Sequence, residues 1–180
     1  MEEDAIQQSE EGLLPVTLVL GGTRSGKSRF AESLILAHGD GTYVATAEAR
    51  DDEMTARIQH HKDLRGAAWH TIDAPLDLAD ALVTAETIGR PLLVDCLTLW
   101  LSNLMEAERD IGRETDALAS ALASLTIPIV MVSNEVGQGI VPANALARQF
   151  RDHAGELNQT MAAQADRVFF VTAGLPAQLK

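Results

Sequence analysis

Short runs of apolar residues alternate along this chain with longer segments in which apolar residues recur every three or four positions. The short runs have the length and β-branched content of strands buried on both faces, and the longer segments have the periodicity of helices. Strands are predicted at Val16–Leu20, Thr42–Thr46, Trp69–Ile72, Leu92–Cys96, Ile127–Val132 and Arg167–Thr172. Helices are predicted at Ser28–His38, Asp51–Leu64, Leu76–Ile88, Leu97–Ala107, Glu114–Leu125 and Ala143–Ala165. This alternation predicts an α/β fold with a mostly parallel sheet and helices on both faces.

The length of 180 residues predicts a single domain with a substantial core. Residues 1–14 are rich in acidic and polar side chains and have little to bury, so we predict a disordered acidic tail before a domain over residues 15–180. No apolar run reaches membrane-spanning length, and the start Met1-Glu2-Glu3-Asp4 lacks the basic region of a signal peptide. These features predict a cytoplasmic protein without a membrane span.

The formal net charge is −12, which argues against binding to nucleic acid through a basic face. The sequence contains one cysteine, Cys96, which excludes an internal disulfide and a cysteine-cluster zinc site. Because Cys96 follows an apolar run, we expect it to be a buried packing residue and not a reactive thiol.

A glycine-rich octapeptide lies between the first predicted strand and the first predicted helix, and it fits the phosphate-binding pattern G-x-x-x-x-G-K-[ST]. Glycines let successive backbone N–H groups point at one anion, and the start of the helix adds the positive end of its dipole. A glycine-rich turn without a ligand is disfavoured because the strand and the helix that the motif needs are both predicted. We therefore predict a nucleoside triphosphate site with a P-loop made of Gly21, Gly22, Thr23, Arg24, Ser25, Gly26, Lys27 and Ser28.

Polar residues of the P-loop and of a later strand end have expected roles in phosphate chemistry. Lys27 would reach the β- and γ-phosphates, and the hydroxyl of Ser28 would ligate Mg²⁺. Arg24 either offsets phosphate charge during transfer or is a solvated loop side chain. Asp95 ends an apolar run, which fits an acidic residue that holds Mg²⁺ beside Ser28, although an Asp here could also cap the next helix. Thr98 could cap the same helix or contact a phosphate.

A cationic segment follows the second predicted strand. His60 and His61 are adjacent and lie close to Lys62 and Arg65 in an otherwise acidic chain. Cationic neighbours lower the pKa of a histidine, which keeps its imidazole neutral and nucleophilic near pH 7, and they attract phosphates. The residues alone equally allow a structural role for both histidines.

The fifth predicted strand is followed by Ser133–Pro142, a loop with two glycines and with a proline near the next helix start. Asn134 and Glu135 lie at the sheet edge where ligands bind, so they could contact a substrate, or they could belong to an ordinary turn. The last predicted helix carries an apolar stripe that we expect to be core and not a cofactor site, made of Leu146, Phe150, Leu157 and Met161.

Several of these segments together resemble one family, the bifunctional adenosylcobinamide kinase / adenosylcobinamide-phosphate guanylyltransferases of cobalamin (vitamin B12) biosynthesis. The P-loop pattern occurs in many families, whereas the motifs SNEVGQGIVP and DDEMxxRIxxH are specific to this one. The resemblance extends from about Pro15 onward. The segments that carry it are Gly21–Ser28, Tyr43–Ala47, Asp51–His61, Val94–Asn103, Ser133–Pro142, Arg148–Asn158 and Val168–Lys180.

The resemblance implies a P-loop NTPase fold of the RecA-like type and two reactions at one site. First, the γ-phosphate of ATP or GTP passes to the hydroxyl of the aminopropanol arm of adenosylcobinamide. A histidine then attacks the α-phosphate of GTP, and the guanylyl group moves from that histidine to adenosylcobinamide phosphate, which gives adenosylcobinamide-GDP. The implied cofactor is Mg²⁺, and members of the family are similar in forming homo-oligomers, trimers in the best-known case.

The same resemblance places the nucleophile at His61, with His60 as a neighbour that spacing alone does not exclude. Besides the P-loop, the residues that it implies for the guanine nucleotide site are Ala45, Thr46, Ala47, Lys62, Asp63, Leu64, Arg65, Asp73 and Asp95. The sequence departs from the family pattern at two places. Residues 62–66 read KDLRG where R-x-E-R-P is common, and an Asp is found at position 73 where Glu is commoner.

Two other function classes fit part of the pattern. A single-step small-molecule kinase would use the same P-loop and Asp95, with both histidines as surface residues. A nucleotide-dependent switch of RecA-like fold would act on a protein or a nucleic acid, and the acidic charge disfavours the nucleic-acid version. Covalent labelling of the protein by GTP that carries the label at its α-phosphate would separate a guanylyltransferase from both.

Overall fold

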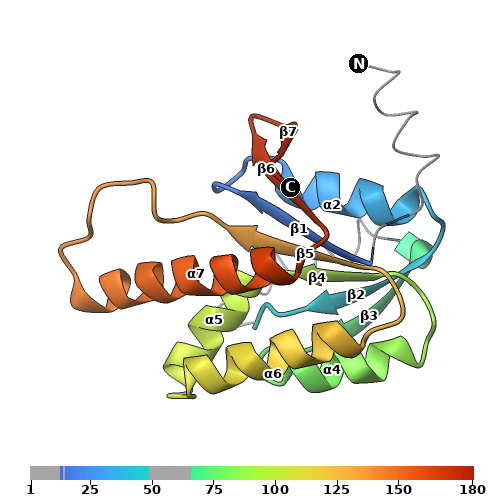
Figure 1. Ribbon diagram of the computed structural model, residues 1–180, viewed down its shortest axis with the longest axis horizontal. Coiled ribbons are helices and arrows are strands. Elements are labelled where there is room, and N and C mark those ends of the chain that lie inside the picture. Colours follow the sequence, from blue (N-terminus) through green and yellow to red (C-terminus); the bar gives the residue numbers. More distant parts are fainter. Residues whose placement is uncertain (1–12, 14, 49–65) are drawn as a thin grey trace.

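The structure, a computed structural model, describes residues 13, 15–48 and 66–180 of the chain. Its strands are β1 (Val16–Gly21), β2 (Gly41–Ala45), β3 (Trp69–Asp73), β4 (Leu92–Asp95), β5 (Ile129–Asn134), β6 (Arg167–Thr172) and β7 (Leu175–Gln178). In the described part of the chain these form one seven-stranded sheet in the order β3-β2-β4-β5-β1-β6-β7 (Figure 1). Neighbouring strands pair in parallel except at one edge, where β7 is antiparallel to β6. The predicted mostly parallel sheet is confirmed.

The helices are α2 (Lys27–Leu36), α4 (Leu78–Glu86), α5 (Leu97–Glu106), α6 (Ile111–Ser124) and α7 (Ala145–Gln164), with a 3₁₀ turn η1 (Gly66–Ala68). Every predicted strand is confirmed, and so is every predicted helix within the described residues, with ends that shift by a few residues. The predicted helix over residues 51–64 and, apart from Leu13, the predicted tail over residues 1–14 lie outside the described residues.

Helices cover both faces of the sheet, as predicted (Figure 1). On one face α4, α5, α6 and α7 pack over the strands in a core that contains Trp100 and Leu157. On the other face α2 inserts Ala31 and Ile35 against a second core that includes Val19 of β1. Every residue of β1 is buried, because a strand covered from both sides has no solvent-facing positions. The P-loop therefore extends from a fully buried strand.

The strand β7 is absent from the sequence-based prediction. Its residues are all exposed, so they show no alternation of buried and exposed positions, and Pro176 is a residue that central strands exclude. Its turn with β6 consists of Ala173 (φ 53°) and Gly174 (φ 80°), the left-handed pair that a two-residue hairpin turn of type I′ requires. An edge strand of this kind is specified by its turn and not by its apolar pattern.

The predicted core stripe of α7 is wrong at Leu146, which is 62% exposed. Figure 1 shows α7 beginning well beyond the end of the sheet, after the long loop that follows β5. Only the later turns, with Leu157 and Met161, pack fully on the core, while Phe150 is partly buried against it. Helical spacing predicts the face of a residue, and the length of sheet beneath the helix decides whether that face is covered.

The carboxyl ends of the parallel strands bring the predicted site residues to one edge of the sheet. Ala45 at the end of β2 is the register partner of Asp73 on β3 and of Asp95 on β4. Two strands further along, Gly21 at the end of β1 is paired with Asn134 at the end of β5. Residues distant in the sequence thus form one row at the edge where α/β sheets bind ligands.

Candidate nucleotide-binding and catalytic site

The P-loop, residues 21–28, joins the end of β1 to the start of α2. Gly21 is required because a Cβ there would lie 2.6 Å from the Oγ of Ser25 and 2.6 Å from the carbonyl oxygen of Val171. Gly26 precedes α2 with a φ of 97°, a left-handed conformation that favours glycine. The sequence therefore produces the compact, backbone-rich turn at a helix N-terminus that suits a phosphate.

Lys27 is the first residue of α2 and is 8% exposed. Its Nζ donates to the carbonyl oxygen of Gly22 at 3.1 Å, so the ammonium group folds back over the loop. The first-turn N–H groups of a helix have no intrahelical acceptor and carry the positive end of the helix dipole. The ammonium group and this helix start together form an electropositive cradle. Ser28, half-buried in the same turn, stays the predicted Mg²⁺ ligand of the loop.

Asp95 ends β4 and is half-buried at the same edge of the sheet. Tyr43 on the neighbouring strand β2 donates its hydroxyl to Asp95 Oδ2 at 2.8 Å, which holds the carboxylate in place. The N-cap position of α5 belongs to Cys96 and not to Asp95. The helix-cap interpretation of Asp95 is therefore wrong, and its metal role stays a prediction.

Cys96 is buried, as predicted from its place after a strand. Burial raises the pKa of its thiol, the neighbouring Asp95 carboxylate raises it further, and the Lys27 ammonium group opposes the shift. The thiol therefore stays protonated and unreactive at neutral pH. The strand β5 pairs with both β4 and β1, so the end of β4 at Asp95 and the P-loop after β1 lie at the same edge of the sheet.

Thr46 and Asn103 hold the turn that follows Asp95. The Thr46 hydroxyl accepts a hydrogen bond from the Cys96 N–H and donates one to the Cys96 carbonyl oxygen, both at 2.8 Å. The Asn103 side-chain amide on α5 donates to the carbonyl oxygens of Thr46 and Pro75, at 2.8 and 2.9 Å. The Thr46 hydroxyl is thus used inside the protein, and the Thr46 N–H donates to the Asp95 carbonyl oxygen at 3.3 Å. The contact of Thr46 with a nucleotide stays a prediction.

Thr46→Val is expected to lower the free energy of unfolding by about 1–3 kcal/mol, because it leaves the buried N–H of Cys96 without its partner. The Cys96 carbonyl oxygen loses one donor but keeps the hydrogen bond from the Trp100 N–H at 3.2 Å. The matched control is Thr42→Val. Thr42 lies on β2 and is fully buried like Thr46, but its hydroxyl has no hydrogen-bond partner among the described residues. Its replacement is expected to change the unfolding free energy by less than about 1 kcal/mol. Urea unfolding measures both values, and equal losses would contradict the role given to Thr46.

A second set of side-chain hydrogen bonds joins α7, β5 and α5 behind the site. The Asn158 amide on α7 donates to the Asn134 carbonyl oxygen at 3.2 Å, and the Asn134 amide donates to the Thr98 hydroxyl at 2.7 Å. The Thr98 hydroxyl is therefore engaged with β5, and Thr98 lies inside α5 and not at its N-cap position. Asn103 and Asn158 are absent from the sequence-based candidates. A polar residue on the buried face of an amphipathic helix is the signal that could have identified both.

Glu135 directly follows β5 and lies against the P-loop. Its N–H donates to the Gly21 carbonyl oxygen at 3.1 Å. Its carboxylate accepts a hydrogen bond from the Gly137 N–H, which is the behaviour of a turn residue. The structure thus supports the turn interpretation for the Glu135 side chain, while its main chain fixes the start of the P-loop.

The other predicted nucleotide-binding residues fall into two groups. Ala45 is buried, Ala47 is half-buried and Asp73 is exposed, at or just after the ends of β2 and β3 in line with Asp95. Arg24 is exposed on the P-loop, with a φ of 56°. The remaining ones lie outside the described residues, and these are His61, Lys62, Asp63, Leu64 and Arg65, together with the neighbour His60.

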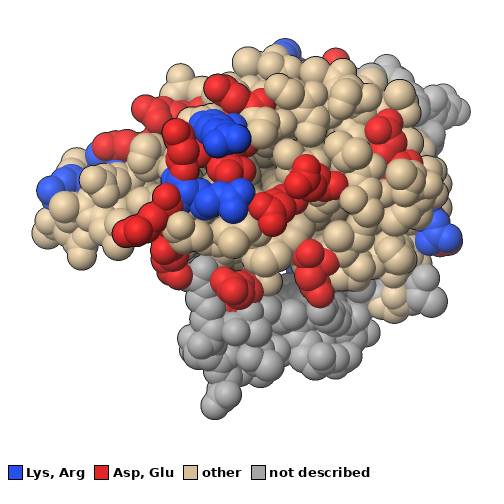
Figure 2. Space-filling view, turned by 90° about the horizontal axis from the view of Figure 1, so that it is seen from below, with Lys and Arg blue, Asp and Glu red and all other residues tan. Residues whose placement is uncertain are grey.

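The surface of the helical face agrees with the acidic composition. Figure 2 shows Asp and Glu side chains spread over this face, with Lys and Arg in small groups among them.

Within residues 13, 15–48 and 66–180, no helix has the length and apolarity needed to cross a membrane. The same residues hold no group of three His, Cys, Asp or Glu side chains that could bind a metal. A metal here would be shared with nucleotide phosphates, which is how Mg²⁺ is commonly held.

Comparison with solved structures supports the α/β fold with its mostly parallel sheet. The P4 protein from bacteriophage phi6 in complex with ADP is similar to this chain with a TM-score of 0.53 at 16% sequence identity. The match covers 93% of this chain and 54% of the P4 chain, so this chain spans about half of that protein. At this level of identity the likeness concerns the fold alone.

Curated relatives match almost the whole chain. The bifunctional adenosylcobalamin biosynthesis protein CobP of Pseudomonas aeruginosa is 48% identical over 166 residues, covering 91% of this chain and 96% of CobP. The proteins called CobU of Salmonella typhimurium and Escherichia coli are 44% and 38% identical, each covering 91% of this chain and 98% of the relative. A family model described as cobinamide kinase / cobinamide phosphate guanyltransferase matches residues 17–179. The chain belongs to the cobinamide kinase / cobinamide phosphate guanyltransferase family.

Proposed function

We propose that this protein phosphorylates adenosylcobinamide and then transfers GMP from GTP to adenosylcobinamide phosphate, giving adenosylcobinamide-GDP in cobalamin biosynthesis. The observation that carries the proposal is the single sheet edge that brings the P-loop beside Asp95, in a chain whose family match spans residues 17–179. The family description names both activities, and the three relatives are bifunctional adenosylcobalamin biosynthesis proteins, which agrees with the resemblance of the motifs.

In the first reaction the γ-phosphate of ATP or GTP is transferred to the substrate hydroxyl. The hydroxyl oxygen forms a bond to the γ-phosphorus, the bond to the β,γ-bridging oxygen breaks, and the hydroxyl proton passes to solvent water. A nucleoside diphosphate leaves. Lys27 lies over the loop, where its ammonium group stabilises the charge that develops on the transferring group and on the bridging oxygen.

The residues at the site fit a Mg²⁺ ion. Ser28 and Asp95 offer a hydroxyl and a carboxylate oxygen near the P-loop, and nucleotide phosphates supply the remaining oxygen ligands that Mg²⁺ prefers. The hydrogen bond from Tyr43 fixes the orientation of the Asp95 carboxylate. When bound, Mg²⁺ neutralises charge on the transferring phosphate.

In the second reaction we assign His61 as the nucleophile. A neutral imidazole nitrogen forms a bond to the α-phosphorus of GTP, and the bond to the α,β-bridging oxygen breaks, releasing pyrophosphate. A phosphate oxygen of adenosylcobinamide phosphate then bonds to the same phosphorus, and the N–P bond breaks to return the imidazole. Ala45 and Asp73, in the row that contains Asp95, support a guanine nucleotide on this side of the P-loop.

The rival single-step kinase explains the P-loop and Asp95 but not a family match that includes guanylyl transfer. A nucleotide-dependent switch explains neither reaction of the family.

The homo-oligomer implied by the resemblance stays a prediction, and so does the cytoplasmic location. Exposed apolar side chains near the start of α7, with Ile140 at 97% and Leu146 at 62% exposure, are of the kind that a subunit contact would cover.

The test of the function is incubation with GTP labelled at the α-phosphate, without any corrinoid. The protein should become labelled, and the label should be lost in acid and kept in alkali, as for a phosphoramidate. Added adenosylcobinamide phosphate should discharge the label into adenosylcobinamide-GDP. GTP labelled at the γ-phosphate is the control and should leave the protein unlabelled. A protein that stays unlabelled after incubation with α-labelled GTP would favour the single-step kinase.

A further inference from the structure

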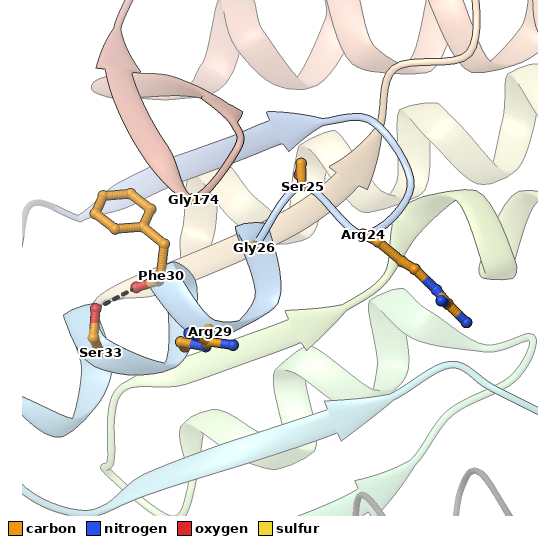
Figure 3. Close-up of a pocket in the computed structure, with 7 residues that line it drawn as sticks. All are labelled: Arg24, Ser25, Gly26, Arg29, Phe30, Ser33 and Gly174. Carbon is orange, nitrogen blue, oxygen red and sulfur yellow. Dashed lines mark hydrogen bonds between the residues drawn. The ribbon is translucent and has the colours of Figure 1, made fainter.

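A pocket of about 420 Å³ lies beside the P-loop, between α2 and the β6–β7 hairpin (Figure 3). This volume is within the range of about 300–1,000 Å³ that small-molecule sites occupy. Its wall on α2 consists of residues three or four positions apart, which share one helical face. The lining side chains and glycines used below are Gly26, Arg29, Phe30, Ser33 and Gly174.

The pocket wall has the chemistry that stacks a flat aromatic ring. Phe30 packs edge-on against Phe169 with ring centroids 5.0 Å apart, so the core fixes the Phe30 ring in place. Figure 3 shows Phe30 beneath the hairpin turn at Gly174. A Cβ at Gly174 would meet no described atom within 4 Å, so this turn leaves open space above the pocket. Arg29 adds an exposed guanidinium group, which stacks on bases and pairs with phosphates.

The pocket is joined directly to the P-loop. The Gly174 N–H donates to the Ser25 carbonyl oxygen at 2.7 Å, and a Cβ on Gly26 would lie 3.1 Å from the Gly174 Cα. The hairpin therefore touches the loop at the point where α2 begins. A ligand whose phosphates lie in the loop can place its base in this pocket without a gap between the two.

The strand order separates this pocket from the expected guanine site. β6 and β7 lie on one side of β1, whereas β5, β4, β2 and β3 lie on the other. The pocket is on the β6–β7 side, and the row of Asp73, Ala45 and Asp95 is on the opposite side. The two candidate positions for a nucleotide base thus flank the same P-loop.

The two reactions take place at opposite ends of the triphosphate group of a nucleotide. One is at the γ-phosphorus and the other at the α-phosphorus, and both need the same charged residues, Lys27 and Asp95. Phosphoryl transfer needs the γ-phosphorus near Lys27 and Asp95, so the rest of that nucleotide runs away from Asp95, past Gly26. Guanylyl transfer needs the α-phosphorus near the same charges, so its base lies toward β2 and β3. We propose that the phosphate donor of the kinase reaction places its purine base in the pocket formed by Phe30, Arg29 and Gly174, on the opposite side of the P-loop from the guanine base of the second reaction. This inference rests on the proposed function.

Filling the pocket with Ser33→Trp tests the inference. The probes are a non-hydrolysable β,γ-imido analogue of ATP and inorganic tripolyphosphate, each titrated with Mg²⁺ present. The variant should bind the ATP analogue about tenfold more weakly, because the base loses its stacking site, while tripolyphosphate binding stays within about twofold. Labelling of the protein from α-labelled GTP should also continue. The matched control is Ser120→Trp on α6, another exposed helical serine whose hydroxyl donates to a backbone carbonyl, and it should change neither affinity.

Arg29→Ser is the second variant, chosen because the loss of one exposed side chain leaves the core intact. It should weaken the ATP analogue about threefold or more and leave tripolyphosphate binding unchanged. Unchanged affinity for the ATP analogue in both variants, or an equal loss for both probes, would overturn the inference. These binding outcomes need no corrinoid. A protein that bound the analogue through the pocket but made no adenosylcobinamide-GDP would instead overturn the proposed function.

Discussion

Lys27→Ala is expected to reduce both phosphoryl transfer and guanylyl transfer by about 100-fold or more, the loss typical for removing one group that stabilises transition-state charge. Lys27 lies 3.1 Å from the Gly22 carbonyl oxygen over the P-loop, so its loss removes the ammonium group from the phosphate site itself. Both reactions should fall together, because both nucleotides place phosphates in this loop. Rates of adenosylcobinamide phosphate formation and of protein labelling from α-labelled GTP measure the two effects.

Lys180→Ala is the matched control for this prediction. The Lys180 ammonium group also donates to backbone carbonyl oxygens, those of Ala162 and Ala163, but at the far end of the chain. Its removal should leave both rates within about twofold, since a surface change away from the site has little effect. Normal kinase turnover in the Lys27 variant, with GTP labelling lost, would contradict a shared phosphate site. Thermal unfolding of both variants checks that neither loss comes from misfolding.

The fold was largely predictable because its strands are buried on both faces. A doubly covered strand such as β1 (Val16–Gly21) appears in the sequence as a nearly continuous apolar run, broken only by Thr17, and the alternation with helical periodicity then limits the fold class. The strand β7 (Leu175–Gln178) could not be found in this way, since all its residues are exposed and its pairing depends on the turn at Gly174. Leu146 shows the opposite error of a prediction from apolar pattern. It lies at an apolar position of a helix, but the tertiary arrangement leaves it exposed.

The candidate site was predictable only where its residues are neighbours in the sequence. The P-loop is one octapeptide, so its strand, glycines and helix start could be identified together. The hydrogen bonds that hold the Asp95 turn join residues far apart: Tyr43 to Asp95 over 52 positions, and Thr46 to Cys96 over 50. No local pattern specifies such pairs, so Thr46 was expected at the nucleotide and Asn103 was not considered. Both act on the backbone that positions Asp95.

His61→Asn is expected to abolish protein labelling from α-labelled GTP, a loss of about 1,000-fold or more, because the amide of Asn cannot form the bond to phosphorus. Phosphorylation of adenosylcobinamide should continue, since that reaction passes the γ-phosphate directly to the substrate hydroxyl and uses no protein nucleophile. The polar amide of Asn extends about as far from the backbone as one imidazole nitrogen does, so the change in side-chain size and polarity is small. Labelling and kinase turnover, measured on the same preparation, separate the two reactions.

His60→Asn is the matched control, because it makes the same chemical change at the adjacent position. Labelling should survive in this variant if His61 is the nucleophile. Label retained in His61→Asn but lost in His60→Asn would move the nucleophile to His60, and label retained in both would place it elsewhere in the chain. A parallel loss of kinase turnover in His61→Asn would mean that this residue positions the nucleotide for both reactions. The pair of variants therefore tests the chemistry of the second reaction separately from the P-loop, which Lys27→Ala tests for both.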